Sequence, residues 1–93
     1  MISLDLFGQM SLYRYAGYRV VSVSVTGSSW AGQGQAELVV DGFSQGLVIL
    51  PTYQVVQTIY PNRMEYIGNS MSSMLLTLRG NNTISSVVVR LAR

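Results

Sequence analysis

The sequence predicts an all-β fold: a single antiparallel β-sandwich of about seven or eight strands, jelly-roll-like, formed by residues 1–93 as one domain. Apolar and polar residues alternate in many short segments, most strictly over residues 20–25, as expected for half-buried strands. Turn residues separate these segments at intervals of roughly eight to twelve residues, a spacing typical of sandwiches and barrels. A chain of 93 residues is long enough for one core and too short for two lobes around a cleft.

The first part of the chain contains two clear strand patterns. Residues 2–6 alternate and stop at Gly8, and we expect residues 10–12 to resume a strand that ends before Gly17. Residues 18–26 alternate over their whole length, which predicts a second strand. The side chains expected to face inward on this strand are Val21, Val23 and Val25.

The middle of the chain continues as loop, strand and turn. Residues 27–34 contain three glycines and two serines and predict a loop. Residues 35–40 predict a third strand, followed by a hairpin turn at Asp41-Gly42, because glycine adopts the positive φ that tight turns need. Residues 47–50 predict a buried strand, and residues 53–60 a further one.

The last part of the chain ends in a predicted hairpin. Residues 61–73 have some helix-like apolar spacing, but Gly68-Asn69-Ser70 and neighbouring serines favour a loop with a short strand or a single helical turn. Residues 74–79 and 84–91 predict strands joined by the tight turn Gly80-Asn81-Asn82. The side chains expected to face inward on the last strand are Val87, Val89 and Leu91.

Strand counting predicts which loops meet. If each strand crosses the sandwich, successive connections alternate between its two ends. One end then carries the Trp30 loop, residues 51–53 and the turn at residues 80–82. The other end carries Gly17, the Asp41-Gly42 turn and residues 61–73. This counting fails if residues 44–60 form a single bent strand.

The composition argues against catalysis. Histidine, cysteine and lysine are absent, which removes the usual general base, thiol nucleophile and Schiff-base amine. Asp5, Glu37, Asp41 and Glu65 are dispersed, which disfavours a paired-carboxylate site and falls short of the ligand count of a good calcium site. We therefore expect no enzyme activity, no catalytic residue, no metal and no cofactor.

Charge and hydropathy bear on partners and location. The six arginines are scattered, so we expect no nucleic-acid binding. Charged residues make up only 11% of the chain, and weak mutual repulsion with a large apolar fraction favours a homo-oligomer. No segment reaches the roughly 18–20 apolar residues that span a bilayer, so we expect no membrane insertion. No signal peptide is visible, and we expect an extracytoplasmic domain (secreted, periplasmic or surface) trimmed of its leader.

Aromatic and amide side chains are the candidate ligand-binding groups. An exposed Trp30 would stack on a sugar ring or anchor a partner, and its alternative role is a lid over the core. Tyr13 and Tyr15 share a face if their stretch is extended, and they serve either stacking or ordinary cross-strand packing. Asn81-Asn82-Thr83 matches the glycosylation acceptor pattern, which the turn alone also explains. The complete set of candidates is Trp30, Tyr13, Tyr15, Tyr53, Asn81 and Asn82.

Two parts of the chain resemble galactose-binding-like jelly rolls, a family that includes carbohydrate-binding modules. The closing hairpin of that family is similar to residues 74–82 and 84–91, and its central strand and turn are similar to residues 36–42. The resemblance implies a jelly roll that recognises glycans, and it identifies no binding residue by motif. We therefore expect a non-catalytic extracytoplasmic recognition module for glycan or cell-surface material. The alternative is a self-associating structural subunit of the fibre, pilus or capsid type.

Overall fold

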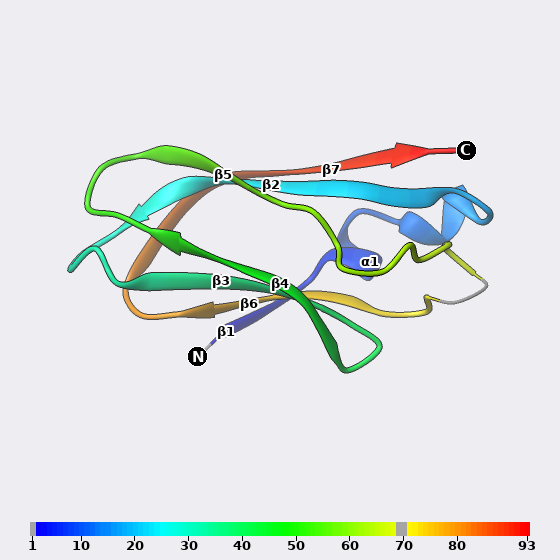
Figure 1. Cartoon of the computed structure of the whole chain (residues 1–93), viewed down its shortest axis with the longest axis horizontal. Coiled ribbons are helices and arrows are strands. Elements are labelled where there is room, and N and C mark those ends of the chain that lie inside the picture. Colours follow the sequence, from blue (N-terminus) through cyan, green and yellow to red (C-terminus); the bar gives the residue numbers. More distant parts are fainter. Residues whose placement is uncertain (1, 69–70) are drawn as a thin grey trace.

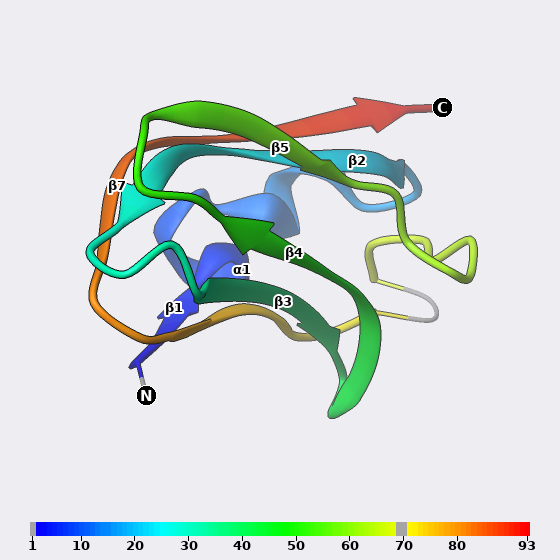
Figure 2. The same cartoon turned by 60° about the vertical axis from the view of Figure 1, so that its left-hand side comes forward.

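The computed structural model describes residues 2–68 and 71–93, which form two antiparallel sheets packed face to face (Figure 1). Figure 2 shows the two sheets as separate layers. The predicted β-sandwich is therefore confirmed, with seven strands in the described part of the chain. The first sheet has the order β1 (Ile2–Asp5), β6 (Met74–Arg79), β3 (Gly34–Val40) and β4 (Phe43–Leu50). The second has the order β5 (Val55–Ile59), β2 (Arg19–Ser29) and β7 (Asn82–Ala92).

The connections wrap the chain around the sandwich. The chain changes sheet at every connection except the β3–β4 hairpin, which is the wrapping of a jelly-roll-like sandwich. In that hairpin, Asp41 and Gly42 have φ values of 50° and 87°. Positive φ at both central residues is the signature of a type I′ turn, whose twist matches that of the flanking strands. The predicted hairpin is confirmed, although β4 begins at Phe43, earlier than the predicted segment 47–50. The burial predicted for that segment is wrong: Leu47 and Ile49 are exposed on the outer face of the sheet, and only Leu50 is fully buried.

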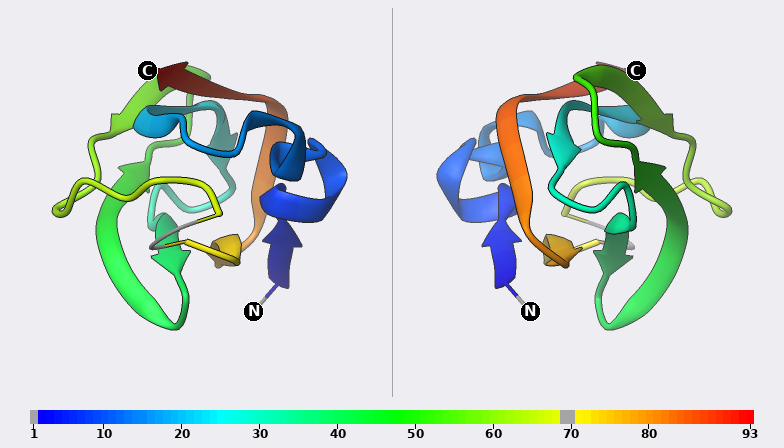
Figure 3. Two further views of the ribbon diagram at one scale, coloured as in Figure 1. Left: turned by 90° about the vertical axis from the view of Figure 1, so that its right-hand side faces the viewer. Right: turned by 90° about the vertical axis from the view of Figure 1, so that its left-hand side faces the viewer.

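The segment after β1 is helical, so the strand predicted for residues 10–12 is wrong. It forms the short helix α1 (Leu6–Gln9) and the 3-10 helix η1 (Leu12–Tyr15), seen at one side of the sandwich in Figure 3. The Gly8 N–H donates to the Asp5 carboxylate at 3.0 Å, so Asp5 caps α1 and ends the strand alternation. Leu6 and Leu12 are both buried in the core. Helical turns, rather than a strand, bring these two leucines into the core. The alternation of apolar and polar residues therefore did not predict the structure of this segment.

A β-bulge in β2 changes which valine enters the core. The pairing of β2 with β7 passes from Val20–Leu91 to Ser22–Arg90, leaving Val21 without a partner. Val20 is buried and Val21 is only half-buried, so the predicted inward position of Val21 is wrong. An extra residue on one strand shifts the two-residue period by one, which sequence alternation alone does not reveal. Val23 and Val25, beyond the bulge, are fully buried as predicted.

The core lies between the two sheets. β2 contributes Val23 and Val25 from one layer, and Leu38 and Leu76 face them from the other, all with no exposed surface. The inward side chains of β7 pack on this core but stay half-buried. These half-buried side chains are Ile84, Val87, Val89 and Leu91. The core is therefore well covered under β2 and only partly covered under β7.

Residues 61–73 contain no full helix in their described part, as predicted. They are held by isolated bridges of Tyr66 with Arg19 and of Ile67 with Met71. Ile67 and Met71 are buried, so this loop closes the end of the core to which strand counting assigned it. Asn69 and Ser70, which belonged to that prediction, lie outside the described residues. Within the described ranges, no helix is long and apolar enough to cross a membrane.

Candidate functional site

Three connections meet at one end of the sandwich. They are the loop after β2, the link from β4 to β5 and the turn from β6 to β7, which lie together at the left of Figure 1. The Trp30 N–H donates to the Asn81 carbonyl at 2.9 Å, and the Ser29 N–H donates to the Pro51 carbonyl at 2.7 Å. These contacts confirm the prediction that the Trp30 loop, residues 51–53 and the turn at residues 80–82 share one end. The condition for that prediction is met, since β4 and β5 are separate strands.

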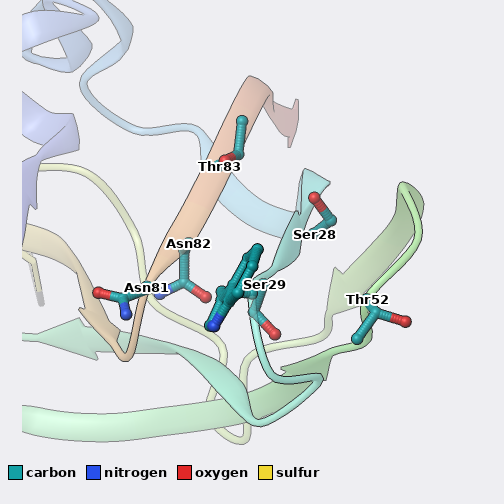
Figure 4. Close-up of a pocket in the computed structure, with 7 residues that line it drawn as sticks. Ser28, Ser29, Thr52, Asn81, Asn82 and Thr83 are labelled. Atoms are coloured by element: carbon teal, nitrogen blue, oxygen red, sulfur yellow. The ribbon is translucent and has the colours of Figure 1, made fainter.

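These connections enclose a shallow depression of about 490 Å³, shown in Figure 4. We call it the Trp30 depression. Its lining contains the only tryptophan, together with hydroxyl and amide side chains and no charged group. The lining residues are Ser28, Ser29, Trp30, Thr52, Asn81, Asn82 and Thr83. A neutral polar wall beside an indole suits a neutral polar ligand better than an ion.

Trp30 projects from this end rather than covering the core. Its side chain is 83% exposed, so the alternative role as a lid is wrong. Ser29, the preceding residue, fills the end of the sandwich in its place and is 4% exposed. Its hydroxyl donates to the Leu50 carbonyl at 2.6 Å and accepts from the Gly34 N–H at 3.0 Å. The backbone on both sides of the Trp30 loop is thus tied to β3 and β4, which gives the exposed indole a fixed base.

Glycine at position 34 lets the β6–β7 turn approach this loop closely. A Cβ added to Gly34 would overlap the side-chain oxygen of Asn82 and lie 2.5 Å from the Ser29 Cβ. The Asn82 side-chain N–H donates to the Arg79 carbonyl at 2.9 Å, which fixes the amide inside the turn. Its side-chain oxygen is buried and has no hydrogen-bond partner in the described structure. That oxygen lies against the Cα–H of Gly34, a weak contact that explains part of its burial.

Several polar groups in the lining remain available to a ligand. In the described part of the chain, the side chains of Ser28, Thr52, Asn81 and Thr83 make no intramolecular hydrogen bond. Hydroxyls and amides are donors and acceptors at once, so they can match either group of a ligand hydroxyl. Asn81 is exposed, while Asn82 is half-buried and serves the turn. Of the two predicted asparagines, Asn81 is therefore the better placed for contact.

The tyrosine candidates lie elsewhere. Tyr13 and Tyr15 belong to η1, toward the opposite end of the long axis in Figure 1, and a 3-10 helix does not give them the shared face of an extended segment. Tyr15 packs edge-on against Tyr18 with ring centroids 5.7 Å apart. The Arg93 guanidinium lies 4.9 Å from the centre of the Tyr18 ring. Tyr15 and Tyr18 therefore pack against each other and against an arginine, whereas Tyr13 is exposed and makes no such contact within the described residues.

Tyr53 is near the Trp30 depression but outside its lining. It precedes β5, which begins at Val55, so the strand predicted for residues 53–60 starts two residues late. Its ring is 68% exposed. Thr52 lines the depression in its place. The chain bends at residues 52 and 53 as it passes from one sheet to the other, so the strand begins only beyond them.

Sequence reasoning missed four residues of the lining: Ser28, Ser29, Thr52 and Thr83. Each adjoins a residue or loop that strand counting placed at this end, which was the available signal. No group of three or more acidic, histidine or cysteine side chains comes together within the described residues. The fold and this end define an antiparallel β-sandwich with an aromatic, uncharged depression between its loops. The chain matches no protein-family model, no curated protein and no solved structure.

Proposed function

We propose that this protein is a non-catalytic recognition module that binds a neutral glycan, or similar hydroxyl-rich surface material, at the Trp30 depression. The observation that carries the proposal is an 83% exposed indole beside hydroxyl and amide groups that have no intramolecular partner in the described structure. An indole offers a flat apolar surface for the C–H face of a sugar ring. The neighbouring side chains then orient the ring hydroxyls.

The rigidity of the loop supports a binding role. Binding costs free energy for every group that must be ordered, so a preformed site binds more tightly than a mobile one. The backbone N–H groups of Ser29 and Trp30 are both hydrogen-bonded, to Pro51 and Asn81 respectively. The Ser29 hydroxyl adds two buried hydrogen bonds. The backbone that carries the indole is therefore held by hydrogen bonds, and the ligand has chiefly the indole side chain itself to order.

The absence of charge in the lining supports a neutral ligand. Arginine and lysine form the strongest hydrogen bonds to phosphate and carboxylate groups, and the lining contains neither. Sugars without acidic groups present uncharged partners, chiefly hydroxyl groups, which hydroxyl and amide side chains can match. An extracytoplasmic location is part of the proposal, since such material is most abundant outside the cell. Fractionation of the native host, probed with an antibody to this chain, tests that part separately.

The experiment is retention of purified protein on a broad glycan array, followed by titration of the best ligand. We expect Trp30→Ala to weaken binding at least about tenfold, which corresponds to about 1.4 kcal/mol. Tyr60→Ala is the matched control, because Tyr60 is a comparably exposed ring (70%) outside the depression. The control should bind as the unmodified chain does. Retention that is lost equally in both variants, or a chain that binds no glycan on the array, would refute the proposal.

A further inference from the structure

β7 is a long strand with an open edge. It has 11 residues and, among the strands that the structure describes, pairs only with β2, so it forms one edge of the three-stranded sheet. Within the described residues, no other main-chain group bonds to it between Ser86 and Leu91. An exposed strand edge presents unpaired N–H and C=O groups that can pair with another chain. β7 therefore carries a ready site for strand addition.

The other sheet edges are shorter or covered. β1 has four residues and β5 has five. Along β4, the Gln57 side-chain N–H donates to the Ile49 carbonyl at 3.0 Å and the Asn62 N–H donates to the Gln45 carbonyl at 3.2 Å. Natural edge strands are usually protected by lysine, proline, bulges or covering segments. From Ser86 to Leu91, β7 contains neither lysine nor proline; its one charged residue there is Arg90, and its bulge at Ser85 lies outside this stretch.

The inner face of β7 is incompletely buried. Val87 and Val89 point into the sandwich but are only half-buried, whereas Val25 and Val23, which pair with them on β2, have no exposed surface. β2 has a neighbour on both sides, and β7 lacks one on its outer side. A further strand placed there would cover the half-buried row. It would also bring this sheet to four strands, equal to its partner sheet, as in the usual jelly roll of about eight strands.

We infer that the missing neighbour is β7 of a second copy of this chain, paired antiparallel across a two-fold axis at Val89. In this register Val87 lies opposite Leu91 of the second copy, so the two aliphatic rows continue each other. On the outer face, Val88 lies opposite Arg90 of the second copy. The two arginines are therefore not directly opposite, which avoids the destabilising like-charge pair. A self-complementary strand in a two-fold arrangement satisfies both open edges at once.

The low charge of the chain favours the second copy as the occupant. The net charge is +2, so two copies repel each other weakly. The Trp30 depression touches β7 only at its first two residues, Asn82 and Thr83, which lie seven and six positions from the proposed axis at Val89. The rest of β7 runs along the side of the sandwich (Figure 1). Pairing through β7 therefore leaves the depression free. The inference is independent of the proposed glycan binding, and each is tested by a different variant.

Analytical ultracentrifugation with substitutions of opposite charge at Val88 tests the inference and its register. We expect a dimer for the unmodified chain and at least tenfold weaker association for Val88→Lys, because the lysine would face Arg90 of the second copy. Val88→Glu should retain or strengthen the dimer through the same arginine. Val56→Lys is the matched control, because Val56 is a similarly exposed valine (64% against 58% for Val88) on the other edge strand of the same sheet. It should leave the dimer unchanged.

Disulfide trapping gives a second measurement. The chain contains no cysteine, so Val89→Cys introduces a single thiol at the proposed axis. Oxidation should link two copies through this residue, whereas Val56→Cys should give little linked product. An unmodified chain that stays monomeric up to about 1 mM would overturn the inference, and strand addition by another protein would then be the remaining use of this edge. A dimer affected equally by lysine and glutamate at position 88 would overturn the register and with it the proposed interface.

Discussion

Replacing Ser29 by alanine removes the hydroxyl that joins the Trp30 loop to the neighbouring strands. The hydroxyl donates to the Leu50 carbonyl at 2.6 Å and accepts from the Gly34 N–H at 3.0 Å. Ser29 is 4% exposed, so water has little access to either group after the substitution. Two buried backbone groups, the Leu50 carbonyl and the Gly34 N–H, then lose their hydrogen-bond partner. The methyl group of alanine can neither donate nor accept a hydrogen bond in place of the hydroxyl.

The expected loss of stability follows from the number of groups left unsatisfied. A buried donor or acceptor without a partner costs about 1–3 kcal/mol. Two such groups give about 2–4 kcal/mol when some local adjustment is allowed. A small domain has a total unfolding free energy of about 5–15 kcal/mol. We therefore expect Ser29→Ala to remove a large part of the stability while leaving the chain folded in dilute buffer.

Urea unfolding followed by far-ultraviolet circular dichroism measures this loss. With a slope of about 2 kcal/mol per molar urea, the middle of the range for small proteins, the midpoint should fall by about 1–2 M. Ser28→Ala is the matched control, because Ser28 is adjacent and half-buried, and its hydroxyl makes no intramolecular hydrogen bond in the described structure. We expect it to change stability by less than about 0.5 kcal/mol. If the two variants unfold within about 0.5 kcal/mol of each other, the hydrogen bonds of Ser29 do not hold this end of the sandwich.

Two further pairs of substitutions probe the core and the β3–β4 turn. Leu38 is fully buried, so Leu38→Ala should lower the free energy of unfolding by about 2–5 kcal/mol. Leu47 is 45% exposed, so Leu47→Ala should lower it by less than about 1 kcal/mol. Similar losses for the two variants in urea unfolding would contradict the assigned core. Asp41 has a φ of 50° and accepts hydrogen bonds from Ser72 at 3.0–3.3 Å. Asp41→Ala should therefore lower stability by about 1–2 kcal/mol, and Asp41→Asn by less than about 0.5, because asparagine keeps an acceptor and tolerates left-handed backbone. Thermal unfolding measures both, and equal midpoints for the two Asp41 variants would refute this account of the turn.

Much of the fold was predictable because a half-buried strand reveals itself locally. The alternation over residues 18–26 and 35–40 reflects the two faces of a pleated strand, and β2 and β3 confirm it. The Asp41-Gly42 turn was predictable for a similar reason, since positive φ values restrict the residue types. The meeting of the Trp30 loop with the turn at residues 80–82 followed from strand counting, which needs only the number of strands between two loops.

Other features depend on contacts between distant segments, and no local pattern reports them. The bulge that moves Val20 into the core in place of Val21 arises from the register between β2 and β7. The hydrogen bond from the Ser29 hydroxyl to the Leu50 carbonyl joins residues 21 positions apart. Nothing in the neighbouring sequence therefore distinguishes Ser29 from an ordinary loop serine. The exposure of Trp30 could not be predicted either, because that serine and Gly34 decide what fills the end of the sandwich.

The alternation of apolar and polar residues determined that two pleated layers would form, because this pattern depends only on residues that are neighbours along the chain. Tertiary structure alone decided how deeply each inward side chain is buried, because burial depends on which strands lie alongside. Val23 and Val89 illustrate the difference: both were predicted to face inward and both do, but only Val23 is fully covered. β2 lies between two strands, whereas β7 has a neighbour on one side only, and this arrangement is absent from the local sequence pattern.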